Sequence, residues 1–222
     1  MERKKFKIRY KRLFVFLLIL LVIFLIALYL VNLKISNIYV SGNYYYDDQK
    51  IIEAAKLQDY PRTFFNNIIS IEKRISSSDY FVSAKVKKKF FREVYIEVEE
   101  NRPLFYSDIK KKTVLKNGLE VSDVFNVPIL TNAVSDDVYN EFLEKLSLID
   151  LSVFDNISEI SYVPNDVDKD LFLFIMNDRN YVYINLDRFT SINKYFDMIV
   201  KFNNHKGILY LDSGEYFKIL DN

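Results

Sequence analysis

The sequence predicts an α+β protein with a single N-terminal transmembrane helix, and three observations support that prediction. Residues 13–31 contain no charged residue, glycine or proline. Residues 35–100 read as strand, helix, helix, strand, strand, and residues 104–222 alternate further strands with amphipathic helical segments. The chain has only four glycines and four prolines, and they lie where turns between these segments are expected.

The apolar run LFVFLLILLVIFLIALYLV (residues 13–31) is long enough to cross a bilayer. At about 1.5 Å per residue its helix spans roughly 28 Å, close to the hydrocarbon thickness. A cleaved signal peptide has a shorter apolar region that ends at small residues, whereas this run continues into Tyr29 and Leu30 with only Ala27 small. A buried core helix would carry a polar stripe. We therefore expect a retained signal anchor.

Charge predicts the orientation of this anchor. Seven lysines and arginines precede the run, and residues 1–12 carry a net charge of +6. Positively charged flanks remain in the cytoplasm, so we expect a cytoplasmic basic tail over residues 1–12 and an extracytoplasmic remainder. Residues 13–222 carry 24 lysines and arginines against 29 acidic residues, which argues against a nucleic-acid-binding surface. The absence of cysteine excludes disulfides and thiolate chemistry.

The first extracytoplasmic segment is predicted to comprise a strand over 35–40, helices over 47–57 and 66–75, and a hairpin of strands 82–90 and 94–100. Both hairpin strands alternate apolar with charged residues. With a loop at residues 91–93, Lys87 lies opposite Glu97 and Lys85 opposite Glu99, while Val86 meets Val98 inside. Pro103 is expected to end this domain.

The second segment, residues 104–222, is predicted to be a mixed β-sheet domain with flanking helices. Asn117-Gly118 marks a tight turn between short strands at 113–115 and 119–121. We expect a helix over 135–149 with Ser135 as its N-cap, strands over 157–163, 171–176 and 181–185, and a helix over 190–202. Strands over 207–211 and 215–220 close the chain.

Four local patterns resemble the FtsQ/DivIB family of bacterial cell-division proteins. They are Ile38-Tyr39-Val40-Ser41-Gly42-Asn43, IEVEENRP at residues 96–103, NVPIL at 126–130, and GILYLDSGEYF at 207–217. The resemblance covers residues 1 to about 219. Asn101 and Phe91 depart from the family pattern, in positions where Arg and Pro are usual, and the fold expectation is unchanged.

The resemblance implies a POTRA domain over residues 35–103 and a β domain of FtsQ/DivIB type over 104–222. It implies a non-catalytic divisome scaffold, enriched at the division septum, that binds the ectodomains of FtsL-like and FtsB/DivIC-like bitopic proteins and acts indirectly on a septal peptidoglycan synthase. Binding by edge-strand addition would involve a surface that includes Tyr210, Asp212, Ser213, Gly214, Tyr216 and Phe217. The alternative is that these aromatic residues only pack the sheet.

No residue pattern indicates an enzyme, a cofactor or a metal site. The single histidine, His205, lies in the polar segment NNHKG, and zinc sites need three or four ligands. Acidic pairs such as Asp47-Asp48 are explained by helix starts. Two other hypotheses remain: a POTRA-type surface receptor or chaperone for secreted polypeptides, and a tethered cell-wall hydrolase, which the missing catalytic constellation disfavours.

Overall fold

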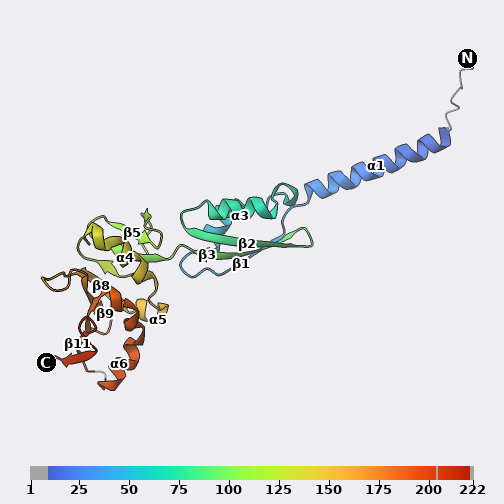
Figure 1. Cartoon of the computed structure of the whole chain (residues 1–222). Coiled ribbons are helices and arrows are strands. Elements are labelled where there is room, and N and C mark those ends of the chain that lie inside the picture. The colour runs from blue at the N-terminus through green and yellow to red at the C-terminus, as the bar shows by residue number, and fades with distance from the viewer. Residues whose placement is uncertain (1–9, 204, 221–222) are drawn as a thin grey trace, which may run out of the picture. The chain divides into compact units, whose positions relative to one another are not determined.

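The structure, a computed structural model, describes residues 10–203 and 205–220 (Figure 1). Residues 1–9 of the predicted basic tail lie outside the described residues. The chain divides into two compact units, Met1–Glu100 and Asn101–Asn222. Each unit has its own sheet and its own core, so each is described by itself.

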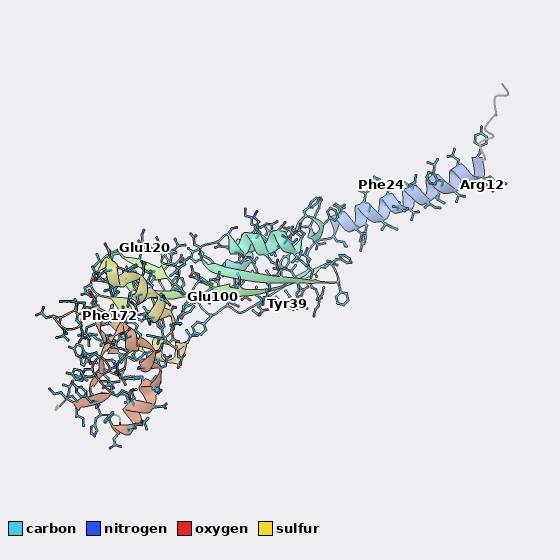
Figure 2. The ribbon with its side chains drawn as sticks, viewed as in Figure 1. Arg12, Phe24, Tyr39, Glu100, Glu120 and Phe172 are labelled. Atoms are coloured by element: carbon cyan, nitrogen blue, oxygen red, sulfur yellow. The ribbon has the colours of Figure 1, made fainter. Side chains whose placement is uncertain are left out.

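Helix α1 (Tyr10–Asn32) contains the whole predicted apolar run. Its side chains radiate along the full length of the helix, from Arg12 near one end past Phe24 (Figure 2). None of its residues is buried. Within the described part of the chain it is the one helix long and apolar enough to cross a membrane. An all-round apolar helix of this length is typical of a transmembrane segment.

The first unit has a three-stranded sheet with one helical layer. Its strands are β1 (Asn37–Ser41), β2 (Phe81–Lys89) and β3 (Glu93–Glu100), in the order β1-β3-β2. β1 is parallel to β3, and β2 is antiparallel to it. The helices are α2 (Asp48–Ala55), the 3-10 helix η1 (Thr63–Phe65) and α3 (Ile68–Ser76). The predicted strand, helix, helix, strand, strand order is confirmed.

Both α-helices of this unit begin at side-chain caps. The Asp47 carboxylate accepts a hydrogen bond from the Lys50 amide at 2.8 Å, and the Asn67 side chain accepts one from the Ser70 amide at 2.8 Å. Such caps satisfy amides that have no partner within the helix. The core consists of the buried faces of the two helices and of the sheet, namely Ile51, Ala55, Ile71, Ile75, Val86, Val94, Ile96 and Val98.

The predicted hairpin register is wrong by two residues. Lys85 lies opposite Glu97, Val86 opposite Ile96, and Lys87 opposite Tyr95. The chain turns one residue earlier than expected, because Phe90 and Phe91 adopt positive φ angles of 49° and 59°. A shift of two residues keeps the paired side chains from Ala84 to Lys89 on their predicted faces. The apolar residues therefore still point inward.

The second unit is built on a nine-stranded mixed sheet with the order β12-β11-β10-β9-β8-β7-β4-β5-β6. Parallel pairing joins β4 to β7, β7 to β8, and β10 to β11. The strands are β4 (Pro103–Ser107), β5 (Lys112–Leu115), β6 (Glu120–Val121), β7 (Ile129–Leu130), β8 (Ile157–Tyr162), β9 (Leu171–Met176), β10 (Tyr181–Asn185), β11 (Gly207–Tyr210) and β12 (Tyr216–Ile219).

Helices of the second unit supply the other half of its core. They are α4 (Asp136–Ser147), α5 (Leu151–Phe154), the 3-10 helix η2 (Leu186–Lys194) and α6 (Tyr195–Lys201). Phe142 of α4 stacks on Phe172 of β9 with ring centroids 4.7 Å apart, and Phe189 of η2 meets Phe172 and Phe174 edge-on. Aromatic contacts of this kind add to the burial of apolar area.

Three predictions about the second unit are corrected. Pro103 begins β4 instead of ending a domain. Ser135 is the N-cap residue of α4 as predicted, but its side chain makes no capping hydrogen bond, and its hydroxyl lies 2.9 Å from the Tyr162 hydroxyl instead. The helix expected over 190–202 is a 3-10 helix followed by α6. Leu186, Phe189 and Ile192 are buried at intervals of three residues, the repeat of a 3-10 helix. Helix α5 was not predicted.

Candidate partner-binding surface

The predicted partner surface lies on the last two strands of the second unit. β12 stands at one end of the sheet order, and in the described chain its strand partner is β11. The two strands are antiparallel, with Tyr216 opposite Tyr210, Phe217 opposite Leu209, and Lys218 opposite Ile208. β12 is therefore an edge strand.

The backbone of β12 offers hydrogen-bonding groups on its outer side. The Leu220 amide donates to the Lys206 carbonyl at 3.0 Å, so Leu220 faces β11. In an antiparallel pair the residues alternate between facing the partner strand and facing away. The amides and carbonyls of Phe217 and Ile219 consequently point away from β11, where a further strand can pair.

A row of three tyrosines crosses one face of the sheet toward this edge. Tyr183 of β10 stacks on Tyr210 of β11 with centroids 5.4 Å apart, and Tyr210 stacks on Tyr216 of β12 at 4.4 Å. Tyr216, the outermost of the three, is 51% exposed. The row gives the edge an aromatic surface on the face opposite the helices.

The structure separates the six predicted residues into three groups. Tyr210 and Tyr216 belong to the tyrosine row. Phe217 points to the opposite face, where it packs against the core and stacks on Phe202 at 4.7 Å. Asp212, Ser213 and Gly214 form the connection between the strands, in which the Ser213 hydroxyl donates to the Asp212 carboxylate at 3.4 Å. Phe217 thus has a packing role, while the other residues reach the surface.

Three residues that sequence reasoning missed shape this edge: Tyr183, Asn180 and Gly207. The side chain of Asn180 is fully buried. Its oxygen accepts a hydrogen bond from the Gly207 amide at 2.8 Å, and its nitrogen donates to the Tyr195 hydroxyl and the Asp178 carboxylate at 2.9 Å each. Burial raises the pKa of Tyr195, so its hydroxyl stays protonated at neutral pH. Alternation in YVYIN could have indicated Tyr183; the other two depend on tertiary contacts.

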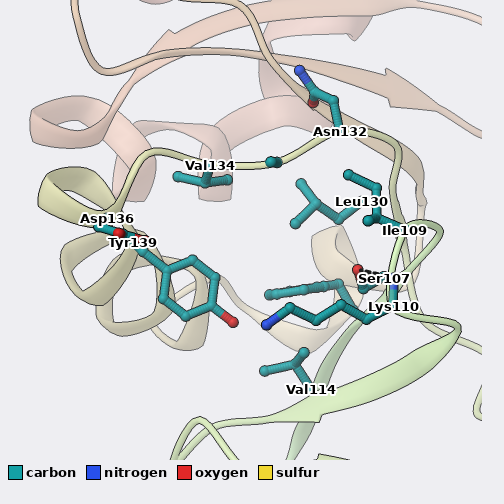
Figure 3. A pocket seen from close by; sticks show the side chains of 11 residues that line it. Ser107, Ile109, Lys110, Val114, Leu130, Asn132, Val134, Asp136 and Tyr139 are labelled. Carbon is teal, nitrogen blue, oxygen red and sulfur yellow. Dashed lines mark hydrogen bonds between the residues drawn. The ribbon is translucent and has the colours of Figure 1, made fainter.

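A second feature of this unit is a small pocket of about 220 Å³ between the β4–β5 hairpin and the start of α4. Tyr139 and Lys110 project into it beside Leu130 and Val134 (Figure 3). The Lys110 ammonium lies 2.6 Å from the Glu120 carboxylate, and this hydrogen bond raises the pKa of Lys110. Burial raises the pKa of Tyr139. At neutral pH, Lys110 is therefore protonated and Tyr139 is neutral.

Across residues 10–203 and 205–220, no group of three or more His, Cys, Asp or Glu side chains could hold a metal ion. His205 is exposed next to β11. The arrangement of β12 suits protein binding through backbone pairing.

Comparisons with known proteins show which proteins this chain is similar to. The family model for the POTRA domain of FtsQ type matches residues 33–101. Cell division protein DivIB of Bacillus subtilis is 27% identical over 188 residues, covering 81% of this chain and 72% of that protein. DivIB of Bacillus anthracis is 24% identical, covering 99% of this chain and 86% of that protein. The match to DivIB of Enterococcus faecalis is 25% identical and spans half of that protein.

A solved structure is also similar in part. It is the major extracytoplasmic domain of the cell division protein DivIB from Geobacillus stearothermophilus, with 22% identity and a TM-score of 0.40. The match covers 46% of this chain and 92% of that domain.

These findings define the class of the protein: an apolar N-terminal helix followed by a POTRA domain and a mixed β unit. The chain contains a POTRA domain of FtsQ type over residues 33–101 and is similar along nearly its whole length to DivIB cell-division proteins.

Proposed function

We propose that this protein is a non-catalytic, membrane-anchored scaffold of the bacterial divisome. It binds the ectodomains of FtsL-type and FtsB/DivIC-type bitopic proteins through the edge strand β12, and so helps to control septal peptidoglycan synthesis. The observation that carries the proposal is the match to DivIB proteins along nearly the whole chain, together with the outer side of β12, which pairs with no strand among the described residues.

The topology in this proposal follows from the anchor. Residues 1–12 form the cytoplasmic tail and residues 13–31 cross the membrane, because positively charged flanks remain inside. The POTRA domain and the β domain, which meet at residues 100 and 101, then lie outside the cytoplasm. A partner with its own membrane anchor meets these domains at the raised effective concentration that shared tethering supplies.

Edge-strand pairing with a partner requires the backbone amide of Ile219 as a hydrogen-bond donor. Its amide points away from β11, and its side chain is about half exposed. Proline at an outward-facing position of an edge strand leaves the native sheet intact but removes a donor. Alanine at the same position removes most of the side chain and keeps the amide.

We therefore expect Ile219→Pro to weaken capture of an FtsB/DivIC-type ectodomain by the full chain about fivefold or more, because one lost hydrogen bond corresponds to about 1 kcal/mol. Ile219→Ala is the matched control and should retain most of the affinity. The measurement is a binding titration with detergent-solubilised protein whose fold is checked by circular dichroism. Undiminished capture by folded Ile219→Pro, or an equal loss in both variants, would contradict edge-strand addition.

A further inference from the structure

Six large apolar side chains gather on one exposed surface of the first unit. They come from η1, from the start of α3 and from the turn between β2 and β3, and we call them the hairpin-tip patch. Phe64, Ile68, Ile69, Phe90 and Phe91 line one hollow together with Asn67 and Lys88. Phe65, which is 60% exposed, meets Phe64 edge-on with ring centroids 5.4 Å apart. Ile69, Phe90 and Phe91 are 77%, 86% and 75% exposed. Isolated exposed apolar residues are ordinary, whereas a contiguous apolar patch marks an interaction surface.

The hairpin-tip patch is attached to the end of the membrane helix by hydrogen bonds. The Thr63 amide, next to Phe64, donates to the Leu33 carbonyl at 2.9 Å. The Arg92 carbonyl, next to Phe91, accepts from the Ser36 amide at 2.8 Å, and the Arg92 guanidinium donates to the Lys34 carbonyl at 3.1 Å. Both segments of the patch are therefore tied to the four residues that follow α1.

This attachment places the patch at the depth of the bilayer surface. α1 ends at Asn32, and a chain extends at most about 3.6 Å per residue. The headgroup regions add roughly 5–7 Å on each side of the hydrocarbon core. Leu33 and Lys34 thus lie at most about 7 Å beyond the end of α1, within or beside the headgroup layer, and Ser36 lies at most about 14 Å beyond it.

The patch is also held in a fixed form. The Lys88 ammonium donates to the Thr63 carbonyl and hydroxyl at 3.0 Å each, and to the Asn66 carbonyl. The Thr63 hydroxyl donates to the Phe91 carbonyl. These bonds join η1 to the hairpin turn. Phe90 and Phe91 have positive φ angles, at positions where glycine or asparagine is usual, and this turn carries both rings into solvent.

Exposed cations border the patch. Lys34 and Arg62 pair as an isolated β-bridge beside η1, and Arg92 follows Phe91 directly. Aromatic rings with flanking lysine and arginine are the residue types that occupy the membrane interface, because the rings enter the acyl boundary while the cations contact phosphates.

We propose that the hairpin-tip patch inserts into the surface of the bilayer that α1 spans, with Lys34, Arg62 and Arg92 at the lipid phosphates. The POTRA domain is then held on the membrane at two places, by its covalent anchor and by this patch. The inference rests on α1 crossing the membrane and is independent of partner binding at β12.

Because the chain contains no tryptophan, a single introduced indole reports its own surroundings. The variants are Phe91→Trp and Phe65→Trp within the patch, and Val82→Trp as the control. Val82 is exposed at the opposite end of β2, about 26 Å from the turn at 3.3 Å per residue. Each full-length variant is placed in nanodiscs of phosphatidylcholine and phosphatidylglycerol, with and without bromine on the acyl chains.

Insertion predicts blue-shifted emission for Phe91→Trp and Phe65→Trp, with most of the intensity lost in brominated lipid, and water-like, unquenched emission for Val82→Trp. Water-like emission from both patch variants would overturn the proposal. Blue-shifted emission that bromine does not quench would also overturn it, since the patch would then be covered by protein, either a second copy or a partner. Two patch variants keep the test decisive if one of them fails to fold.

Discussion

Two glycines at the ends of the β11–β12 hairpin have opposite steric surroundings. A Cβ atom at Gly207 would lie 2.3 Å from the Lys218 carbonyl and 2.6 Å from the Phe217 ring, whereas a Cβ at Gly214 would meet no atom within 4 Å. Gly207 is therefore needed for the close pairing of the two strands. Gly214 lies in open space.

We expect Gly207→Ala to destabilise the second unit by roughly 1–3 kcal/mol, the usual cost of overpacking. Gly214→Ala is the control, and its effect should stay within about 0.5 kcal/mol, as for an ordinary surface substitution. The measurement is the midpoint of urea unfolding of the full chain in detergent. Equal midpoints for the two variants would show that the strands separate to accept the methyl group at Gly207.

At the scale of elements, one buried side chain joins three segments near the partner surface. Asn180 lies in the turn between β9 and β10 and is hydrogen-bonded to Gly207 of β11 and to Tyr195 of α6. Tyr195 also donates to the Asp178 carboxylate at 2.8 Å. β11 is thereby held to the body of the unit by a polar contact in addition to its strand pairing.

Asn180→Ala leaves the Gly207 amide without its acceptor in a buried site, which costs about 1–3 kcal/mol. We expect lower unfolding stability and faster amide hydrogen exchange in β11 and β12 than in β8 and β9. Asn140→Ala, on the exposed side of α4, is the control and should be neutral or slightly stabilising because alanine favours helix. Uniform exchange across the sheet would argue against a local role for Asn180.

At the scale of the whole molecule, the competing hypotheses predict different locations of the protein in the cell. A divisome scaffold has to concentrate where the septum forms, whereas a surface receptor or chaperone for secreted polypeptides acts along the whole cell periphery. Both use exposed strand edges, so the fold does not separate them.

We expect a fluorescent fusion of the full chain to concentrate at midcell in dividing cells, and a fusion of residues 1–34 alone to spread evenly along the membrane. The control removes both folded units and keeps the anchor. Fluorescence microscopy of the two strains makes the comparison. An even peripheral signal from the full chain would contradict the scaffold and favour the receptor.

Features that depend on local periodicity were predicted from the sequence. The apolar run contains no charged residue, so α1 was expected. Asp47 indicated the start of α2, whose N-cap it is. Alternation in the central part of the hairpin, residues 84–89 and 94–98, assigned its side chains to their faces, since a face depends on whether a position is odd or even. Val82 and Phe90 are exposed instead, because the pairing is irregular between Phe81 and Ser83 and the turn begins at Phe90.

Features that depend on non-local contacts were decided by the tertiary structure. The hairpin register differs by two residues because Phe90 and Phe91 accept positive φ, which their residue type does not indicate. The parallel pairing of β10 with β11 brings Tyr183 beside Tyr210, and no spacing in the chain encodes that pairing. The sequence by itself determined the long apolar helix, the order of the elements in the first unit and most of the buried faces, because these follow from each segment's own pattern. Strand order, register and the edge position of β12 required segments far apart in the chain to meet.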